Sequence, residues 1–367
     1  MKLQMVDLLT QYDSIKDEID TAVLNVIRSG QYILGKEVKE LEEKIAHNLG
    51  CKYAVGCASG TDALQVAMMA LDIGPGDEVI TTSFTFVATA ETIALLGAKP
   101  VYVDIREADF NIDPEKIEAA ITDKTKAIIP VHLYGHPAPM DGIMAIANKH
   151  NIPVIEDTAQ AIGAGYNGEK AGTIGTFGCI SFFPSKNLGA YGDGGMITMN
   201  DESLATKSRM IVNHGSRERY KHSEIGVNSR LDTIQAAILL VKLKYLDMWN
   251  DNRRKAAARY SELLRDIPVT TPEELRGNYH IYHQYTIRCK KRDELSNHLK
   301  EKNIPHAIYY PIPLHLQEAY AYLGYSNGDL PVTEKLTDEV LSLPMHPELT
   351  EEQQQYITDA VKEFYNN

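Results

Sequence analysis

From about residue 53 onward, short apolar runs alternate with segments of helical length, and no other feature of the sequence restricts the fold as strongly. The first series has apolar runs at 53–58, 77–84 and 99–105 with helical patterns at 61–71 and 89–97, and a second series covers 126–135, 140–151 and 152–157. Short apolar runs between helices are typical of βαβ units, whose parallel strands are covered on both faces. The sequence therefore predicts an α/β fold with a large, doubly wound, mostly parallel sheet.

Residues 231–266 place apolar side chains at helical spacing over a greater length than one ordinary helix needs. We expect this segment to lead from the large domain into a second one. Residues 1–245 would form an N-terminal segment and the large α/β domain, and residues 246–367 a smaller C-terminal α+β domain. Residues 1–50 show amphipathic helical patterns without a strand of their own. They would pack either on the small domain or on a partner subunit.

The charge balance argues against nucleic acid as a partner. The chain has 37 Lys and Arg against 50 Asp and Glu, which gives a formal net charge of -13, and no dense basic run is present. Such a chain repels a phosphate backbone unless it carries a local basic face. A small anionic ligand is still compatible, because a few backbone N–H groups and one or two arginines bind a phosphate whatever the global charge.

The cysteines and the lengths of the apolar stretches indicate the compartment. The four cysteines form neither a C-x-x-C pair nor the dense spacing of a disulfide scaffold, which is typical of a reducing compartment. The N-terminal segment 1–20 carries acidic residues at short intervals, and no apolar stretch approaches the roughly 20 residues that span a bilayer. We expect a soluble cytoplasmic protein without a membrane partner.

Three segments end apolar runs with small or polar residues, and open α/β sheets bind ligands at such carboxyl-end loops. In the first, Ser59-Gly60-Thr61 ahead of a helix, small residues would let backbone N–H groups approach a phosphate. The alternative is an ordinary N-cap by Ser59 or Thr61. In the second, Asp157 would keep a pyridine nitrogen protonated, with the Gln160 amide near a ring hydroxyl. The alternative is a capping box, since Asp and Gln stand at that spacing.

The third segment, 181–189, places Lys186 after an apolar strand, among aromatic, proline and glycine residues that fix the backbone. A lone lysine at such a place is usually solvated. A desolvated lysine instead has a lowered pKa and forms a Schiff base with an aldehyde. Both interpretations stay open for Lys186 taken alone.

Two further patterns lead to no site. Residues 30–36 have the spacing of a P-loop, but Glu37 stands where the magnesium-binding hydroxyl would be, and no strand precedes them. His132 and His136 stand four residues apart, yet Gly135 and Pro137 break any helix there and no third ligand is evident. We expect no metal ion.

Four motifs occur in the order and approximate spacing of one known family. They are S-G-T-D-A-L at 59–64, E-D-T-A-Q at 156–160, S-F-F-P-S-K-N-L-G at 181–189 and G-V-N-S-R-L-D at 226–232. With them, essentially the whole chain resembles the DegT/DnrJ/EryC1/StrS family of sugar aminotransferases, which use pyridoxal 5'-phosphate (PLP). The resemblance implies the aspartate-aminotransferase superfamily fold, PLP-dependent transferase fold type I, and a homodimer with composite active sites.

The resemblance also implies how the cofactor is held. Lys186 would bind PLP as a Schiff base and, once released, move the proton between cofactor and substrate carbons. Asp157 would pair with the protonated pyridine nitrogen, Gln160 would hold the phenolic oxygen, and Phe84 would stack on the ring. The cofactor phosphate would be bound by Gly60, Thr61 and Ser181, with Asn228 reaching it from the neighbouring subunit.

On the substrate side, the resemblance points to Tyr32, Arg230, His306, Tyr309 and Tyr310. Arg230 would bind an anionic group, and residues 306–311 match a family stretch near the sugar nucleotide. Many relatives carry His where Tyr309 stands, so the role of that position is open. The alternative for each of these residues is a solvated surface or interface position.

The retained Lys186 bears on the reaction, because the family's dehydratase branch replaces this lysine with histidine. The resemblance therefore implies transfer of an amino group from glutamate to a keto-sugar nucleotide. Residues 226–240 and 310–314 look closest to members that act on 3-keto sugars. We expect C3 of UDP-2-acetamido-2-deoxy-3-oxo-D-glucuronate as the acceptor, for lipopolysaccharide or O-antigen sugars. The alternatives are a dTDP-3-keto-6-deoxyhexose aminotransferase, a PLP-dependent sugar dehydratase or lyase, and a non-catalytic PLP-binding protein.

Overall fold

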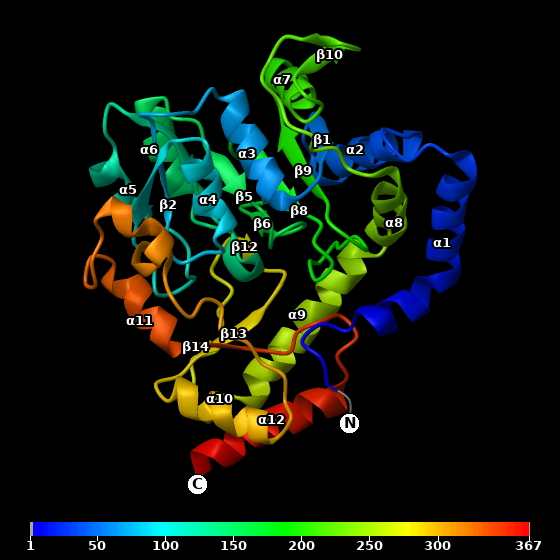
Figure 1. The fold of residues 1–367 in the computed structure, drawn as a ribbon. Helices are drawn as coiled ribbons and strands as arrows, with labels where there is room; N and C mark the ends of the chain where they lie inside the picture. The colour runs from blue at the N-terminus through cyan, green and yellow to red at the C-terminus, as the bar shows by residue number, and fades with distance from the viewer. Residues whose placement is uncertain (1–2, 367) are drawn as a thin grey trace.

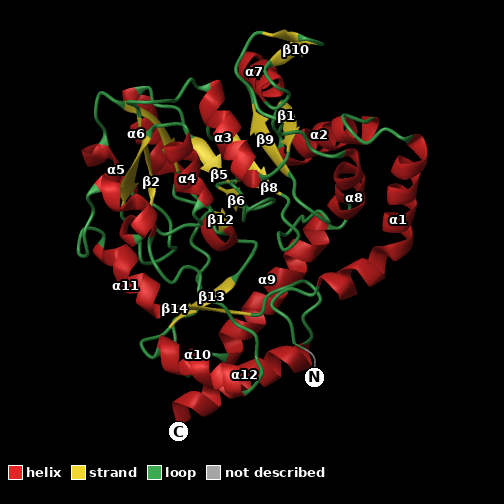
Figure 2. Ribbon diagram, viewed as in Figure 1, coloured by secondary structure: helices red, strands yellow, loops and turns green. Residues whose placement is uncertain are grey.

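The structure, a computed structural model, describes residues 3–366. A large lobe has helices on both faces of a central sheet, and the C-terminal part of the chain forms a smaller lobe beneath it (Figure 1). Strands lie in the interior of the large lobe and helices form its outer layers (Figure 2). This arrangement confirms the predicted α/β fold.

The central sheet is mixed, with one antiparallel strand. Its order is β1-β9-β8-β5 in one part and β3-β2-β4 in the other, and parallel bridges from Ile128 to Val154 and from Val131 to Asp157 join β4 to β5. Only β9 runs antiparallel to its neighbours β1 and β8. The strands are β1 (Tyr53–Cys57), β2 (Glu78–Thr82), β3 (Lys99–Val103), β4 (Thr125–Ile129), β5 (Ile155–Asp157), β8 (Phe177–Ser181) and β9 (Gly195–Met199).

Alternate residues of each strand enter hydrophobic cores on opposite faces of the sheet, because successive side chains of a strand point to opposite sides. In β8, Phe177 and Cys179 enter the core shared with α3, whereas Ile180 enters the core shared with α2 and α8. Helices α5 and α6 cover the second face over β2 and β4. The large-lobe helices are α2 (Lys36–Leu49), α3 (Gly60–Ala70), α4 (Ala88–Leu95), α5 (Pro114–Ala120), α6 (Met140–His150), α7 (Glu202–Ile211) and α8 (Thr233–Leu243).

Three short antiparallel pairings decorate the large lobe. The Asn167-Gly168 turn joins β6 (Gly165–Tyr166) to β7 (Glu169–Lys170), and both turn residues have positive φ, as a tight hairpin requires. Strand β12 (Asn278–Tyr279) adds to β6. The pair β10 (Ser216–Glu218) and β11 (Lys221–His222) projects from the top of the molecule in Figure 1.

The small lobe is built on the two-stranded sheet of β13 and β14, against which helices pack around a separate core. Its elements are α9 (Leu246–Leu263), β13 (Tyr285–Arg288), α10 (Arg292–Glu301), the 3-10 turns Leu314–Leu316 and Glu318–Leu323, α11 (Pro331–Glu339), β14 (Val340–Leu343) and α12 (Glu351–Asn366). The helical pattern at 231–266 is therefore divided, since α8 ends at Leu243 and α9 begins at Leu246. The boundary between residues 245 and 246 stays a prediction, because β12 beyond it returns to pair in the large lobe.

The N-terminal segment contacts both lobes of its own chain. Helix α1 (Leu8–Ser29) packs Ile15 and Ile19 against α8, and the Met345 N–H donates to the carbonyl of Met5 at 3.2 Å. Within residues 3–366, no helix is long and apolar enough to cross a bilayer.

Candidate active site

A cavity of about 540 Å³ opens at the carboxyl ends of β5 and β8, beside the first turn of α3 and under two segments of the small lobe. It is the kind of position at which open α/β sheets bind ligands. Eight of the residues predicted to bind cofactor or substrate line it: Gly60, Thr61, Asp157, Gln160, Ser181, Lys186, Tyr309 and Tyr310.

Lys186 lies in a tightly folded loop that follows β8. The N–H of Phe182 donates to the Gly194 carbonyl at 2.8 Å, and the N–H of Ala190 returns to the Phe182 carbonyl at 2.7 Å. A Cβ at Gly189 would stand 2.2 Å from the Pro184 carbonyl oxygen, so this turn requires glycine. Burial lowers the pKa of Lys186 to about 8, against the opposing attraction of Asp157. The amine is therefore far more often neutral than that of a solvated lysine.

Asp157 presents a buried carboxylate at the end of β5. Oδ2 accepts a 2.8 Å hydrogen bond from the Thr89 hydroxyl and Oδ1 a 3.1 Å bond from the Ala159 N–H. Burial raises the pKa of Asp157, and these two hydrogen bonds oppose that shift because they favour the charged form. No helix begins after Asp157, which rules out the capping-box interpretation.

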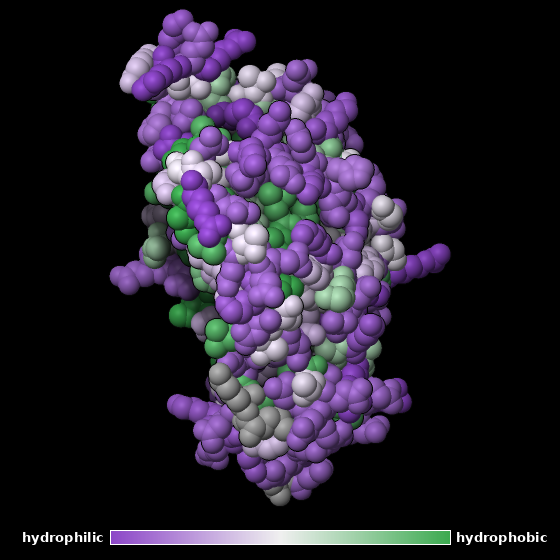
Figure 3. Space-filling model, turned by 90° about the vertical axis from the view of Figure 1, so that its right-hand side faces the viewer, coloured by the Kyte–Doolittle hydropathy of each residue, from purple (hydrophilic) through white to green (hydrophobic). Residues whose placement is uncertain are grey.

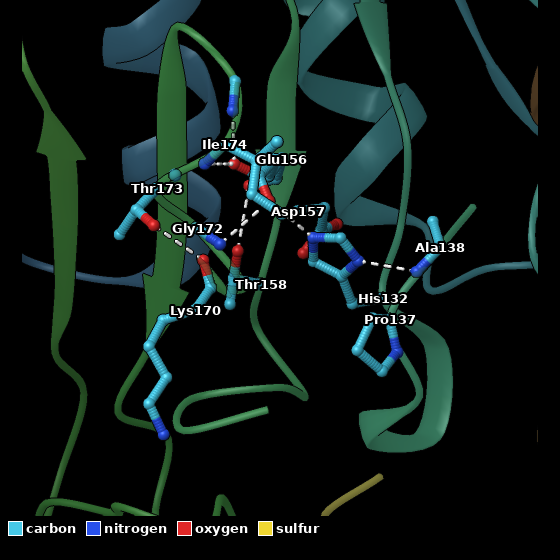
Figure 4. Close-up of polar contacts among 12 residues, drawn as sticks. His132, Pro137, Ala138, Glu156, Asp157, Thr158, Lys170, Gly172, Thr173 and Ile174 are labelled. Carbon is cyan, nitrogen blue, oxygen red and sulfur yellow. Dashed lines mark hydrogen bonds and ion pairs between the residues drawn. The ribbon is translucent and has the colours of Figure 1, made fainter. Parts of the chain in front are cut away.

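Behind Asp157, a fully buried pair of side chains holds the neighbouring loops (Figure 4). The Glu156 carboxylate accepts hydrogen bonds of 2.7–2.8 Å from the N–H groups of Gly172, Ile174 and Gly175. His132 accepts the Ala138 N–H on Nδ1, so its Nε2 carries the proton that is donated to Glu156 at 2.9 Å. This pairing leaves His132 no free nitrogen for a metal ion.

Gln160 is fixed by two tyrosines. Its Oε1 accepts the N–H of Tyr134 at 2.7 Å, and its Nε2 donates to the Tyr310 hydroxyl at 3.1 Å. Since one amide hydrogen is used for Tyr310, the second is free to donate to a ligand. Tyr134 also donates its hydroxyl to the carbonyl of Tyr309, which ties the small-lobe segment to the cavity wall.

The first turn of α3 has both features that its sequence predicts, a side-chain N-cap and backbone N–H groups that are free to bind a phosphate. Ser59 is the N-cap, with its side chain accepting the Asp62 N–H at 3.0 Å. The N–H groups of Gly60 and Thr61 find no acceptor among the described residues, and they point from the positive end of the helix. A Cβ on Gly60 would stand 2.6 Å from the Ser181 Cβ, so only glycine allows this close approach of α3 to β8.

The structure corrects the position of the aromatic residue in the cavity. Phe84 is fully buried and packs on Phe110 with a ring-centroid distance of 6.0 Å, in a hydrophobic core outside the cavity. Phe86, two residues later, lines the cavity with 55% of its surface exposed. Strand β2 ends at Thr82, before both phenylalanines. The alternation of side chains along a strand therefore could not predict whether Phe84 or Phe86 lines the cavity.

Four other predicted residues lie away from this cavity in the same chain. Tyr32 and Arg230 are close to the α1–α2 junction and the start of α8, where Tyr32 donates to the Ile27 carbonyl and Arg230 to Asn213. Asn228 forms a backbone bridge with Asn213. His306 faces the small lobe, where its ring contacts Ser296 at 2.8 Å.

Sequence reasoning also missed residues that the small lobe contributes. His283 and Gln284, just before β13, line the cavity, and Oε1 of Gln284 is buried without a hydrogen-bond partner within residues 3–366. Neither residue stands in a distinctive motif. Thr89, which binds Asp157, was missed as well, although its place in a helix after β2 was part of the predicted pattern.

Comparison with known proteins agrees with this geometry. The profile of the DegT/DnrJ/EryC1/StrS aminotransferase family matches residues 13–362. The chain belongs to this family. It is a PLP-dependent aminotransferase, and the predicted fold class, enzyme class and cofactor are confirmed.

Curated relatives match this family member over nearly their whole length. A protein of Geobacillus stearothermophilus named pleiotropic regulatory protein is 56% identical over 100% of both chains. The UDP-2-acetamido-2-deoxy-3-oxo-D-glucuronate aminotransferase of Pseudomonas aeruginosa is 53% identical over 95% of this chain and 96% of its own. The UDP-N-acetyl-3-dehydro-alpha-D-glucosamine 3-aminotransferase of Acidithiobacillus ferrooxidans is 49% identical over 98% and 97%.

Solved structures of the family superpose closely. DesV of Streptomyces venezuelae, in complex with a ketimine intermediate, has a TM-score of 0.97 at 42% identity, over 100% of this chain and 99% of its own. NtdA of Bacillus subtilis, with bound cofactor PMP, has a TM-score of 0.90 at 32% identity, over 96% and 82%.

The residues of the cavity fit PLP. The amine of Lys186, with its lowered pKa, suits an aldehyde, and the buried Asp157 carboxylate suits a pyridine N–H. The unpaired N–H groups of Gly60 and Thr61, beside the Ser181 hydroxyl, suit a phosphate.

Proposed function

We propose that this aminotransferase moves the amino group of glutamate to C3 of UDP-2-acetamido-2-deoxy-3-oxo-D-glucuronate. The observation that carries the substrate is the 53% identity, over nearly the whole of both chains, to the relative of that name. The relative that is 49% identical is named for another UDP-linked 3-dehydro sugar. The product would be a 3-amino sugar nucleotide for lipopolysaccharide or O-antigen. The free thiols, three of them buried, suit the reducing cytoplasm as its compartment.

The positions of the cavity residues support a role for each of them. PLP, when bound, supplies a conjugated ring that withdraws electrons from the carbon bearing the amine. Lys186 would attach the cofactor and afterwards carry the proton between carbons. Asp157 would keep the pyridine nitrogen protonated, and Gln160 would donate its free amide hydrogen to the phenolic oxygen. Phe86, in place of Phe84, would stack on the ring.

Backbone N–H groups at the start of α3 and the Ser181 hydroxyl hold the cofactor phosphate in this proposal. Tyr309 and Tyr310 face the sugar nucleotide from the small lobe, with His306 behind them. Tyr310 presents a hydroxyl whose oxygen already accepts a bond from Gln160, so its hydrogen is free for the substrate.

A homodimer completes the site in this proposal. Tyr32, Asn228 and Arg230 lie away from the cavity of their own chain, and each would serve the cavity of a second copy. Tyr32 belongs to an exposed apolar stretch with Ile33 and Leu34. Figure 3 shows hydrophobic residues gathered within the otherwise hydrophilic face that lies on the right of Figure 1. A second copy would cover such a surface.

Mixing two inactive variants tests the composite site. Lys186→Ala and Asn228→Ala each lose activity as homodimers, but a heterodimer of the two carries one cavity with both native residues. Random exchange of subunits then restores about a quarter of the wild-type activity. If the mixture stays as inactive as the separate variants, the partner contributes nothing through Asn228 and the composite site is wrong.

An absorbance titration followed by a substrate assay tests the reaction. Glutamate is expected to convert the visible band of the PLP-loaded protein to the shorter-wavelength pyridoxamine form, and Lys186→Ala lacks the original band. The pyridoxamine form is then mixed with UDP-2-acetamido-2-deoxy-3-oxo-D-glucuronate or with a dTDP-3-keto-6-deoxyhexose, and the aminated product is measured by mass spectrometry. Turnover of the dTDP sugar alone would make the alternative substrate correct. A product formed without an amino donor would indicate the dehydratase or lyase alternative.

The relative named as a regulator leaves a non-catalytic alternative to test. Lys186, Asp157 and Gln160, the residues that transamination needs, line one cavity in this chain, which supports catalysis. The absence of any conversion with glutamate or other amino donors, in protein that binds PLP, would favour the non-catalytic alternative.

A further inference from the structure

His283 lies in the wall of the cavity, and none of the roles above uses it. It stands just before β13 and enters from the small lobe, with only 7% of its surface exposed. Its Nδ1 lies 3.0 Å from Oδ1 of Asn187, the residue that follows Lys186 in the chain. The ring is therefore hydrogen-bonded to the residue that directly follows the lysine.

A series of buried hydrogen bonds determines which nitrogen of His283 carries the proton. The carbonyl of Ile162 accepts from Nδ2 of Asn250 at 3.3 Å, so Oδ1 of Asn250 is an acceptor. That oxygen accepts Nδ2 of Asn187 at 2.7 Å, and the Ile281 carbonyl accepts from the same nitrogen at 3.4 Å. Because a carbonyl only accepts, both amide orientations are fixed.

The consequence is a single tautomer of the neutral ring. With Nδ2 of Asn187 donating twice, Oδ1 of Asn187 accepts, and Nδ1 of His283 must donate to it. In a neutral imidazole the other nitrogen then holds a lone pair. Nε2 has no hydrogen-bond partner within residues 3–366, and it is not one of the polar atoms that are fully enclosed without a partner. Because His283 lines the cavity, Nε2 faces that open space.

The surroundings of His283 favour the neutral ring. Burial lowers the pKa of His283 well below its ordinary value, and the positive charges of Lys186 and Arg253 lower it further. Two acids line the same cavity, Asp193 and Asp157, and both oxygens of Asp157 already accept hydrogen bonds. The phenols of Tyr309 and Tyr310 have raised pKa values because they are buried, and so they stay neutral.

We propose that Nε2 of His283 accepts the proton that the ammonium group of the amino donor loses before its nitrogen reacts in this cavity. This inference rests on the proposed function. One N–H bond of the donor breaks and its electron pair stays on nitrogen, while a new N–H bond forms at Nε2 and the ring becomes a cation. The proton returns to an amine when the aminated sugar departs, so each full cycle leaves His283 neutral.

The tautomer is tested first, in cofactor-free protein, by nitrogen NMR of the histidine rings. Wild-type His283 is expected to have a protonated Nδ1 and an unprotonated Nε2 at pH 7, with protonation only well below pH 6.5. Asn187→Ala is the control, because it removes the acceptor that selects the tautomer and should let the Nε2–H form appear. A wild-type ring with its proton on Nε2 would overturn the proposal whatever the substrate is.

The proton transfer is tested by the rate at which glutamate discharges the visible band. His283→Asn keeps a donor for Asn187 but places nothing at Nε2, and its rate is expected to fall about 100-fold, within the range of a general base. The wild-type rate should decline as the pH falls through the pKa of His283, and the variant should lack that decline. An unchanged visible spectrum and melting temperature would show that the variant keeps its site.

The results separate this inference from the proposed function. A variant that reacts at the wild-type rate, or that keeps the same decline at low pH, would overturn the role of His283. If none of the amino donors discharges the visible band of the wild-type protein at any pH, the proposed function is wrong. The role of His283 in that function is then wrong as well. The tautomer measured by NMR would stand in that case, since it needs neither cofactor nor donor.

Discussion

The hydroxyl of Thr89 donates a 2.8 Å hydrogen bond to Oδ2 of Asp157, which ties the carboxylate at the end of β5 to helix α4. This bond opposes the rise in the pKa of Asp157 that burial causes. Thr89→Val removes it and should raise that pKa further. A hydrogen bond to a charged group contributes about 1.5–3 kcal/mol, so the Kd for PLP is expected to increase at least about tenfold. Fluorescence titration of cofactor-free protein measures it.

Thr92→Val is the matched control for this change. Thr92 lies in the same helix, is equally buried, and donates to the Ala88 carbonyl at 2.9 Å without contacting Asp157. It should lower stability slightly and leave the affinity for PLP unchanged. Equal losses of affinity in both variants would mean that Thr89 acts only through the packing of α4.

Lys186 is expected to destabilise the cofactor-free protein near neutral pH. Its pKa is about 8 in the folded protein against 10.5 for an ordinary lysine. Below pH 8 both folded and unfolded chains carry the charge, and the full cost of burying it is present. Between pH 8 and 10.5 the folded chain releases the proton first, so the cost fades as the pH rises.

Lys186→Met should therefore stabilise the cofactor-free protein while abolishing activity. The free energy of unfolding at pH 7 is expected to increase by about 2 kcal/mol. This is less than the full pKa shift of Lys186 would give, because the side chain partly faces the open cavity. Urea unfolding at pH 7 and at pH 10.5 measures the gain, which should shrink at the higher pH. A gain that is the same at both values would show that it does not come from the buried charge.

Glu156 is expected to be a residue of the fold and not of the chemistry. Glu156→Gln replaces one oxygen that accepts backbone N–H groups with a donor, and it leaves buried donors unsatisfied. We expect a loss of about 3 kcal/mol in the free energy of unfolding, measured in urea. Glu169→Gln, exposed in the adjacent hairpin, should change it by less than about 0.5 kcal/mol. Comparable effects of the two changes would contradict the role of the buried network.

Phe84 and Phe86 should respond to truncation in opposite ways. Phe84→Ala empties a site in a packed core and should cost about 3–5 kcal/mol of stability. Phe86→Ala removes an exposed ring from the cavity wall, so it should weaken PLP binding and leave stability nearly unchanged. Unfolding curves and PLP titration of both variants decide the matter, and a loss of cofactor affinity confined to Phe84→Ala would reverse the assignment.

Much of the architecture could be predicted because the spacing of apolar residues indicates which side of a strand or helix is buried. Alternating residues of the apolar runs enter opposite cores, as Cys179 and Ile180 do, and the buried runs require helices on both faces. The motifs around Gly60, Asp157 and Lys186 follow the ends of strands, where parallel topology brings loops together. These three segments do line one cavity.

Other features depend on contacts between distant parts of the chain. Periodicity ends with β2 at Thr82, so the packing of the following loop places Phe84 in the core and Phe86 in the cavity wall. The local spacing of residues also does not indicate which side chains serve the cavity of a partner subunit, as we propose for Asn228 and Arg230.

The sequence by itself determined the strand-and-helix pattern of the large lobe and the presence of a lysine and a carboxylate at strand ends, because these depend on local periodicity and residue type. Only the tertiary structure decided that His283 faces Lys186's cavity with a defined tautomer. Asn187 and His283 are 96 residues apart, and the direction of their hydrogen bond is imposed by the carbonyls of Ile162 and Ile281. Buried hydrogen bonds have a direction because backbone carbonyls cannot donate, and that constraint exists only once the chain has folded.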